Sequence, residues 1–424
     1  MLKYIFKGIF PFLLLLIPNL VFAEKLTILH INDHHSHLEA NSRMGLDLDG
    51  ESTRTKSGGF PAVVTKIKEL RSENPNSLTL HAGDATSGTL YFTLFEGEAD
   101  AALMNAVCFD AFVVGNHEFN NGDQGLVTFL DYLKEGNCQT PVLGANVQPE
   151  IGVSPLAKSS ADDYIQPYTI VERNGEKIGI IGIVISRKTK MSSNPDDTTM
   201  FLDEVTTAQK YADELKSQGV DQVILLSHYG YENDLALAQN TSGIDIIVGG
   251  DSHSLLGDLS DLGLKPSGSY PTMVNDASGN DVCVVTAWQY SQILGELHAE
   301  FDDKGNITSC IGTPHMMLAD SFKRKNSDGE RVEIEEGYRD AVYSVIKVNP
   351  SLSIVEPDAD AQALLAGYSS KIDEFSSKII GSVSEDLCLE RIPGQGKSKM
   401  CDPSKTAKNG SDISNIVAQA FREM

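Results

Sequence analysis

Five short segments of the chain carry aspartate, histidine and asparagine residues directly after apolar runs. They are Asp33-His34-His35, Gly83-Asp84, Gly115-Asn116-His117-Glu118, Ser227-His228 and Gly249-Gly250-Asp251-Ser252-His253. Carboxylate and imidazole groups together suit borderline divalent ions such as zinc and manganese. Two such ions held in one site can hydrolyse phosphate esters. The pattern therefore predicts a two-metal site for this chemistry.

The spacing within the segments supports this prediction. Asp33 and His35 are separated by one residue, so in an extended chain leaving a strand both side chains point the same way. Asp84 follows a glycine that lets the backbone turn, and a short carboxylate at this position can bridge two ions. Asn116 offers a neutral oxygen ligand, and His117 can meet a phosphoryl oxygen. Three further polar positions complete the set: His228, Asp251 and His253.

The elements that position these residues alternate between strand and helix. Short apolar runs predict strands at 26–31, 77–80, 111–114, 142–143, 178–185, 223–226 and 244–248. Helical spacing lies between them at 60–70, 127–133 and 205–215. This alternation predicts a layered α/β architecture with its chemistry in loops at strand ends. Each metal candidate falls at or just after the end of such a strand.

The C-terminal part has a different pattern. Apolar residues repeat at three- and four-residue steps from about Pro357 to Ile380, which predicts one long amphipathic helix. A polar stretch follows, and Ser411–Glu423 reads as a capped helix start. We expect a catalytic domain at 24–350, an interdomain linker helix at 351–380, and the incomplete beginning of a second domain at 381–424.

Residues 1–23 have the features of an export signal. Lys3 and Lys7 form a weak basic start, Phe10–Leu16 is apolar, and Ala23 supplies a small residue for cleavage. A retained N-terminal anchor is the alternative interpretation. The signal predicts a periplasmic or secreted protein without stable membrane insertion. Six cysteines fit an oxidising compartment. Their order favours local pairs among fifteen connectivities: Cys108–Cys138, Cys283–Cys310 and Cys388–Cys401.

The chain is strongly acidic, with 59 acidic against 34 basic residues and a net charge of −25. Such a surface repels nucleic-acid backbones, so we expect no nucleic-acid partner. The charge also disfavours anionic substrates at long range. A phosphate-bearing substrate must therefore be held locally, by metals and a few basic groups.

With these segments in order, the chain resembles the calcineurin-type metallophosphoesterases, specifically the exported 5′-nucleotidase/UDP-sugar hydrolase family. The segment from Leu387 to Gly394 is similar to that of the periplasmic NAD nucleotidases within it. The resemblance implies a four-layer α/β sandwich, an interdomain helix and an α/β C-terminal nucleotide-binding domain. It also implies a monomer that takes a small nucleotide substrate and two divalent ions, zinc, manganese, magnesium or cobalt.

Residue roles follow from the same resemblance. One ion would take Asp33, His35, Asp84 and His253, and the other would take Asp84, Asn116, His228 and Asp251. The catalytic candidates are His117, which would steady charge on the transferred phosphoryl group, and Asn120 beside it. Asn116 and Arg391 would contact the substrate.

Two positions depart from the family pattern. The family usually has His where this chain has Asp251, and a carboxylate there lowers the charge of the site and favours manganese or magnesium. The family's catalytic His is usually oriented by an Asp, and here that position is Asn120. An amide can hold a hydrogen bond but cannot stabilise an imidazolium by charge. Either His117 works with weaker electrostatic support, or Asp123 substitutes.

The predicted function is two-metal hydrolysis of nucleotide 5′-phosphate esters to nucleoside and phosphate. The first alternative is cleavage of the pyrophosphate of NAD or UDP-sugars at the same site. The second is a non-catalytic nucleotide-binding or surface protein that keeps the metal cage.

Overall fold

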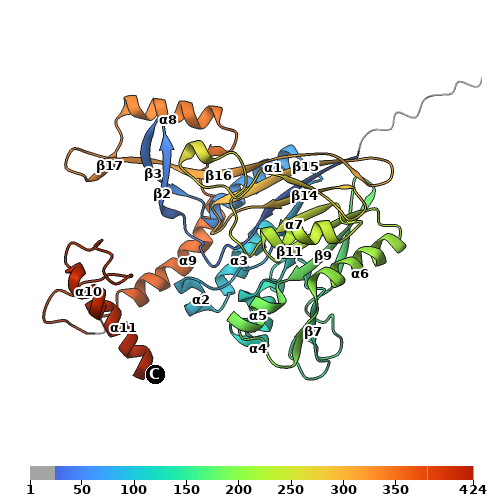
Figure 1. Ribbon diagram of the computed structural model, residues 1–424, viewed down its shortest axis with the longest axis horizontal. Helices are drawn as coiled ribbons and strands as arrows, with labels where there is room; N and C mark the ends of the chain where they lie inside the picture. Colours follow the sequence, from blue (N-terminus) through green and yellow to red (C-terminus); the bar gives the residue numbers. More distant parts are fainter. Residues whose placement is uncertain (1–23, 380, 424) are drawn as a thin grey trace, which may run out of the picture. The chain divides into compact units, whose positions relative to one another are not determined.

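The computed structural model describes residues 24–379 and 381–423 (Figure 1). The predicted export signal at 1–23 lies outside these described residues. The chain divides into two compact units, a first that ends at Ile372 and a second that begins at Asp373. The first unit contains all seven candidate metal ligands together with His117 and Asn120.

Two mixed sheets form the first unit. The larger sheet has ten strands, in the order β2 (Asn41–Leu48), β3 (Glu51–Ser57), β16 (Ile307–Lys325), β15 (Ile293–Phe301), β1 (Glu24–Ile31), β4 (Leu78–His81), β5 (Ala111–Val113) and β6 (Val142–Leu143), with β17 (Arg331–Glu333) and β18 (Leu352–Ile354) also paired to β16. The second has six, in the order β13 (Thr272–Asn275), β14 (Asp281–Thr286), β12 (Ile246–Gly249), β11 (Gln222–His228), β9 (Glu176–Val184) and β8 (Tyr168–Arg173). A separate pair joins β10 (Thr199–Phe201) to β7 (Val147–Pro149).

Helices cover the outer face of each sheet. Against the first sheet pack α1 (Phe60–Glu73), α3 (Glu98–Val107) and α4 (Gly122–Lys134). Against the second pack α6 (Glu204–Ser217) and α7 (Tyr231–Asn240), which Figure 1 shows beside β9 and β11. The inner faces of the two sheets share one apolar cluster. The result is helix, sheet, sheet, helix, and the predicted four-layer α/β sandwich is confirmed.

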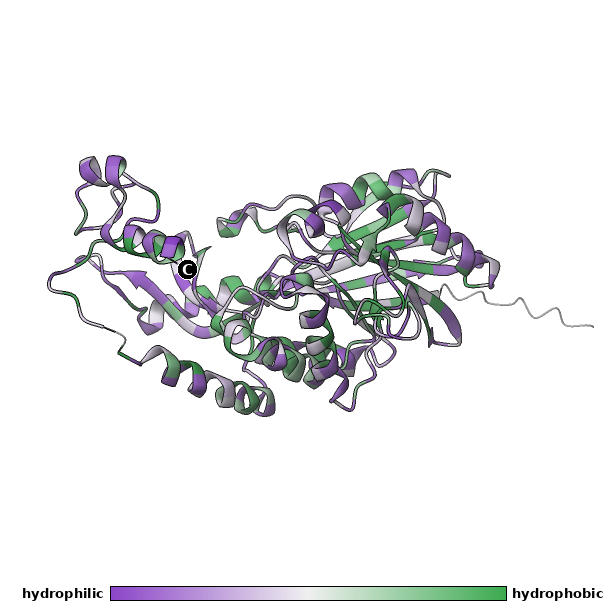
Figure 2. Ribbon diagram, turned by 90° about the horizontal axis from the view of Figure 1, so that it is seen from below, coloured by the Kyte–Doolittle hydropathy of each residue, from purple (hydrophilic) through white to green (hydrophobic). Residues whose placement is uncertain are grey.

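Strand β11 shows why the central strands read as continuous apolar runs. Ile224 and Leu226 belong to the cluster between the sheets, whereas Val223 and Leu225 pack towards α6 and α7. Because alternate side chains leave a strand on opposite faces and both faces are covered, every position must be buried. Figure 2 shows this apolar character along the central strands.

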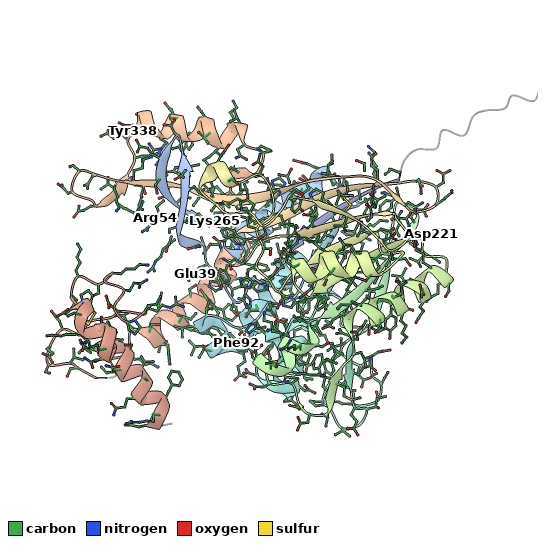
Figure 3. The ribbon with its side chains drawn as sticks, in the orientation of Figure 1. Glu39, Arg54, Phe92, Asp221, Lys265 and Tyr338 are labelled. Carbon is green, nitrogen blue, oxygen red and sulfur yellow. A yellow bond between two sulfur atoms is a disulfide. The ribbon has the colours of Figure 1, made fainter. Side chains whose placement is uncertain are left out.

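Three further helices belong to the first unit: α2 (Leu90–Phe95), α5 (Ser186–Ser192) and α8 (Glu336–Val348). The long helix predicted at 357–380 is α9 (Ala359–Ser376), which crosses the boundary between the units. Its Ala361 and Leu365 are buried in the core that includes α1 and α3. Glu39, labelled in Figure 3, accepts hydrogen bonds from Tyr91 (2.7 Å) and from Ser369 of α9 (3.2 Å). The first part of α9 is therefore fixed to the first unit.

The second unit holds α10 (Pro403–Asn409) and α11 (Asp412–Glu423). Within this unit the Glu390 carboxylate accepts hydrogen bonds from the Gly396 amide (2.6 Å) and the Thr406 hydroxyl. No helix among the described residues combines the length and apolar character that crossing a membrane requires.

The three predicted disulfides are confirmed, and each closes a local loop. Cys108 pairs with Cys138, Cys283 with Cys310, and Cys388 with Cys401, at sequence separations of 30, 27 and 13.

Candidate metal centre

The carboxyl ends of parallel strands from both sheets meet at one edge of the sandwich. Strands β1, β4 and β5 run parallel in the first sheet, and β9, β11, β12 and β14 run parallel in the second. The candidate ligands sit at or just after the ends of five of these strands: Asp33 and His35 after β1, Asp84 after β4, Asn116 after β5, His228 ending β11, and Asp251 and His253 after β12. Topology thus brings together residues that lie more than 200 positions apart in the sequence.

Four side-chain atoms form the first cluster. His35 Nε2 lies 3.1 Å from His253 Nε2, 3.5 Å from Asp84 Oδ2 and 3.7 Å from Asp33 Oδ1. His253 Nε2 also lies 3.3 Å from Asp33 Oδ1. Ligand atoms about 2.1 Å from a tetrahedral ion are about 3.4 Å from one another. The measured spacings are those of ligands around one such ion.

The second cluster is centred on His228. Its Nε2 lies 3.1 Å from Asp84 Oδ2, 3.8 Å from Asp251 Oδ1 and 4.0 Å from Asp33 Oδ1. Asp84 Oδ2 therefore faces both clusters, which is the arrangement of a bridging carboxylate. Asp33 Oδ1 also approaches both, although the resemblance assigns it to one ion.

The surroundings of His228 show that this cluster lacks a positive charge. The ring is fully buried, and its Nδ1–H donates to the Ala82 carbonyl (2.7 Å). Nε2 has no aligned hydrogen-bond partner among the described residues, although three carboxylates surround it. Burial alone would lower the pKa of His228, but those carboxylates outweigh it and raise the pKa well above its ordinary value. A divalent cation supplies the missing charge, so the residues fit a metal.

Asn116 joins the second cluster. In its hydrogen-bonded orientation the amide donates to Asp251 Oδ1 (3.1 Å) and accepts from the His117 backbone N–H (3.3 Å). In the reversed orientation the amide oxygen faces Asp251 Oδ1 at the same distance. The Asn116 amide oxygen and the Asp251 carboxylate oxygen then face each other, and oxygen atoms are the donors that a hard cation prefers.

His117 lies beside the clusters, in the wall of the cavity. Its Nδ1 accepts a hydrogen bond from Asn120 Nδ2 (2.9 Å), and the same amide donates to Ser87 Oγ (2.7 Å). Nδ1 is therefore an acceptor, which leaves the proton of the neutral ring on Nε2. Asn120 thus orients the ring.

The alternative prediction, that Asp123 orients His117, is wrong. Its carboxylate is buried and accepts hydrogen bonds from Ser154 (2.7 Å), Thr199 (2.5 Å) and the Asp196 amide (3.1 Å). These bonds fix the start of α4 against the loop after α5. Both carboxylate oxygens are engaged there, away from the His117 ring.

Backbone strain marks the same residues independently of their side chains. The φ angles of Asp33, His35, Asp84, Asp251 and His253 lie between 48° and 72°, in the left-handed region. Each such residue costs about 1–3 kcal/mol and persists where the surrounding structure requires it. Five of the seven candidate ligands carry this cost, which is typical of a functional site.

Glu118 holds the strained loop after β4 against the loop after β5. Its buried carboxylate accepts hydrogen bonds from the backbone amides of Asp84 (3.0 Å), Ala85 (2.8 Å) and Thr86 (3.0 Å), and from that of Gly115 (2.6 Å). Burial and the nearby carboxylate of Asp84 raise the pKa of Glu118 to about 7. The side chain ties the loop after β4 to the loop after β5.

Comparison with known proteins assigns the chain to one family. The calcineurin-like phosphoesterase model matches residues 26–255, which contain all seven candidate ligands. The chain belongs to the calcineurin-like phosphoesterase family. Calcineurin-like phosphoesterases use a dinuclear metal centre, in agreement with the two clusters that share Asp84.

Individual relatives narrow the comparison. A probable 5′-nucleotidase of Treponema pallidum is 43% identical over 363 residues, 85% of this chain and 59% of the relative. The NAD 5′-nucleotidase of Haemophilus influenzae is 38% identical over 402 residues, 94% of this chain and 64% of the relative. The solved NAD nucleotidase of Haemophilus influenzae has a TM-score of 0.79 at 41% identity, covering 85% of this chain and 70% of that one. The chain therefore spans less than two thirds of the curated relatives' length.

Other residues complete the site without having been predicted. The metal cluster opens into a cavity of about 620 Å³, whose wall includes Lys188, Ser87 and Tyr290. Gln289 accepts a hydrogen bond from His253 Nδ1–H (2.6 Å) and so leaves Nε2 directed at the cluster. Gln289 and Tyr290 follow β14, whose apolar run was the available signal. Lys188 lies just after β9 and obeys the same end-of-strand rule as the ligands.

The remaining candidate, Arg391, belongs to the second unit, where it is exposed. Its contact with substrate stays a prediction. Two further histidines, His30 and His81, are fully buried within β1 and β4.

Proposed function

We propose that this chain hydrolyses the 5′-phosphate ester of nucleotides, with two divalent ions held by the seven candidate ligands. The observation that carries the proposal is the position of Asp84 Oδ2, 3.5 Å from His35 and 3.1 Å from His228. A carboxylate oxygen shared by two imidazole clusters suits a two-metal phosphohydrolase. Relatives named 5′-nucleotidases, at 43% identity and below, support the substrate class.

The chain's own residues then have separate tasks. When bound, two divalent ions polarise the phosphoryl group and lower the pKa of a water molecule. Asp33, His35 and His253 hold one side of the site, and His228, Asp251 and Asn116 hold the other. His117, with its proton on Nε2, donates a hydrogen bond to a phosphoryl oxygen as negative charge develops there. Asn120 keeps that proton on Nε2.

A second candidate function is cleavage of a pyrophosphate, as in NAD, at the same ions. The specific observation in its favour is the likeness to the NAD nucleotidase of Haemophilus influenzae, at 41% identity and a TM-score of 0.79. Both reactions place one phosphoryl group on the ions and differ in the leaving group.

We further propose an exported, monomeric enzyme of small molecules with no nucleic-acid partner. The leader-like residues 1–23, three disulfides and the net charge of −25 support this proposal. Manganese, zinc, magnesium and cobalt all suit the oxygen and nitrogen donors. The domain roles expected from the sequence stay predictions: catalysis at 24–350, a linker at 351–380 within which α9 spans Ala359–Ser376, and the start of a nucleotide-binding domain at 381–424.

The test is phosphate release from AMP and product analysis with NAD, with manganese present and after chelation. We expect release from AMP that chelation abolishes and that added manganese restores. Formation of AMP and nicotinamide mononucleotide from NAD would establish the second activity. Two bound metals without hydrolysis of either compound would contradict the proposal and favour the non-catalytic binding role.

A further inference from the structure

Lys188 reaches the metal cavity from a direction that no ligand uses. It lies in α5, two residues beyond the N-terminal end of that helix, close to the carboxyl end of β9. Its Nζ is 2.5 Å from Asp251 Oδ1, the same oxygen that faces His228 and Asn116. The ammonium therefore stands directly beside the second cluster.

Lys188 is also the sole permanent cation that the described residues contribute to the cavity wall. Among the described residues that line the cavity, no other is a lysine or an arginine. Asp33, Asp84 and Asp251 concentrate negative charge there, in a chain of net charge −25. A substrate phosphate adds further negative charge, and like charges at close range oppose binding. The phosphate needs a cationic partner besides the ions.

We infer that Lys188 is a substrate-binding residue, whose ammonium bridges Asp251 and a non-bridging oxygen of the substrate phosphate. The inference rests on the proposed function, because it concerns the phosphate bound at that site. An ammonium has three protons, and the contact with Asp251 uses one. The side chain is 39% exposed and lines the open cavity, where a phosphate oxygen can reach the remaining protons.

The contact with Asp251 gives the flexible lysine a fixed position. Without it, a side chain with four rotatable bonds would lose much of its conformational freedom on meeting the phosphate. Held by the carboxylate, the ammonium is already oriented before substrate arrives, which lowers that cost. Binding of a phosphate oxygen then forms a charge-assisted hydrogen bond.

Lys190 provides a matched control on the same helix. Its Nζ lies 3.4 Å from the Phe201 carbonyl and 5.7 Å from the centre of the Phe201 ring, and it does not line the cavity. Lys190→Met removes the same charge from α5 as Lys188→Met. A difference between the two variants therefore reports position and not net charge.

The experiment is calorimetric binding of inorganic phosphate to the manganese-loaded full chain, with bound manganese measured in parallel. We expect Lys188→Met to weaken phosphate binding about 10-fold or more, the loss of one charge-assisted hydrogen bond, with manganese content unchanged. Lys188→Arg retains most of the affinity, and Lys190→Met binds phosphate as the unsubstituted chain does.

Two results would overturn the assignment. If Lys188→Met binds phosphate with unchanged affinity, Lys188 only balances the charge of Asp251. If Lys188→Met loses manganese, the residue maintains the metal site and does not bind phosphate. Phosphate release from AMP by the unsubstituted chain separates these failures from failure of the proposed function. If the unsubstituted chain releases phosphate from AMP and Lys188→Met still binds phosphate with full affinity, only the role of Lys188 is contradicted. The proposed function then stands.

Discussion

At the scale of single residues, the site depends on charges that are balanced only when cations are bound. Asp33 and Asp84 are fully buried, and their oxygens face Nε2 of His35, His228 and His253. Nδ1–H of His228 and of His253 donates to an oxygen outside the cluster, so Nε2 of each ring is left for a metal. The Ala82 carbonyl and the Gln289 side chain thus decide which ring atom His228 and His253 offer.

Asn120→Asp is expected to raise phosphate release from AMP about 10-fold. In the present chain the Asn120 amide donates to Nδ1 of His117 at 2.9 Å, so the ring is neutral when oriented. A carboxylate would accept from Nδ1–H and stabilise the imidazolium, a stronger partner for a developing phosphoryl charge. Initial rates at saturating manganese measure the effect.

Asn121→Asp is the matched control, because it adds the same charge one residue further on, at the exposed start of α4. We expect its rate to equal that of the unsubstituted chain. A slower Asn120→Asp enzyme with its manganese intact would show that the neutral ring is the working form.

The sequence indicates the seven candidate ligands because each obeys one rule, a polar residue at the end of a buried parallel strand. The rule does not distinguish a ligand from a substrate contact, so Lys188 passes unnoticed although it meets the same condition. Hydrogen-bond direction is also invisible in sequence, which is why Asp123 could be considered in place of Asn120. In the structure Asp123 bonds to Ser154 and Thr199 instead.

At the scale of elements, the loops after β4 and β5 must approach so closely that only a glycine fits between them. A Cβ on Gly115 would lie 2.2 Å from Asp84 Oδ1 and 2.5 Å from the Asp84 amide nitrogen. Both distances are far below van der Waals contact. The loop carrying Asp84 would therefore have to move.

Gly115→Ala is expected to lower manganese content to at most one ion per chain and phosphate release by at least about 100-fold. The fold should persist, because the clash is confined to the loop edge. Metal analysis measures the manganese content, phosphate release from AMP measures the activity, and circular dichroism checks the fold. Gly45→Ala in β2, where a Cβ meets no atom within 4 Å, is the control and should retain both metals and activity. Retention of both metals in Gly115→Ala would contradict the bridging role of Asp84.

Strands β15 and β16 are joined by a carboxylate with two imidazole partners. Glu296 lies 2.8 Å from His315 Nε2 and 3.2 Å from His298 Nε2. Burial alone would raise the pKa of Glu296, but the hydrogen bonds from His298 and His315 outweigh it and lower that pKa to about 2. The stability that this carboxylate contributes is present above its unfolded pKa of about 4.3 and is lost as the pH falls towards about 2.

Glu296→Gln is therefore expected to lower the free energy of unfolding by about 1–2 kcal/mol at pH 6, where the carboxylate is charged. The difference from the unsubstituted chain should shrink as the pH falls below about 4.5, and urea unfolding at several pH values measures it. Glu300→Gln on the same strand removes an exposed ion pair with Lys25 and should change little. A Glu296→Gln effect that is constant with pH would contradict the charge-based contribution.

The sequence predicts buried central strands better than the rest of the fold. Strands such as β9 and β11 are covered on both faces, so their apolar runs stand out. Strand β2 has only one buried face, with Met44, Leu46 and Leu48 alternating with exposed residues, and was not predicted although that alternation was readable. Strand β16 pairs with four partners, and such long-range pairing leaves no local signal.

At the scale of the whole molecule, the two sheets bring carboxylates together that repel one another unless cations lie between them. Ligands that bind only the folded state raise its stability by mass action. Chelation is therefore expected to lower the melting temperature of the full chain by several degrees, and manganese should restore it. Scanning calorimetry measures the shift. If chelation leaves the melting temperature unchanged, bound metal does not balance the carboxylate charges of the folded state.

The most direct measurement is anomalous diffraction at the manganese edge from crystals of the full chain grown with Mn²⁺. We predict two peaks about 3.5–4 Å apart on either side of the Asp84 carboxylate, one against His35 and His253 and the other against His228 and Asp251. A single peak, or none at this edge of the sandwich, would contradict the two-metal centre.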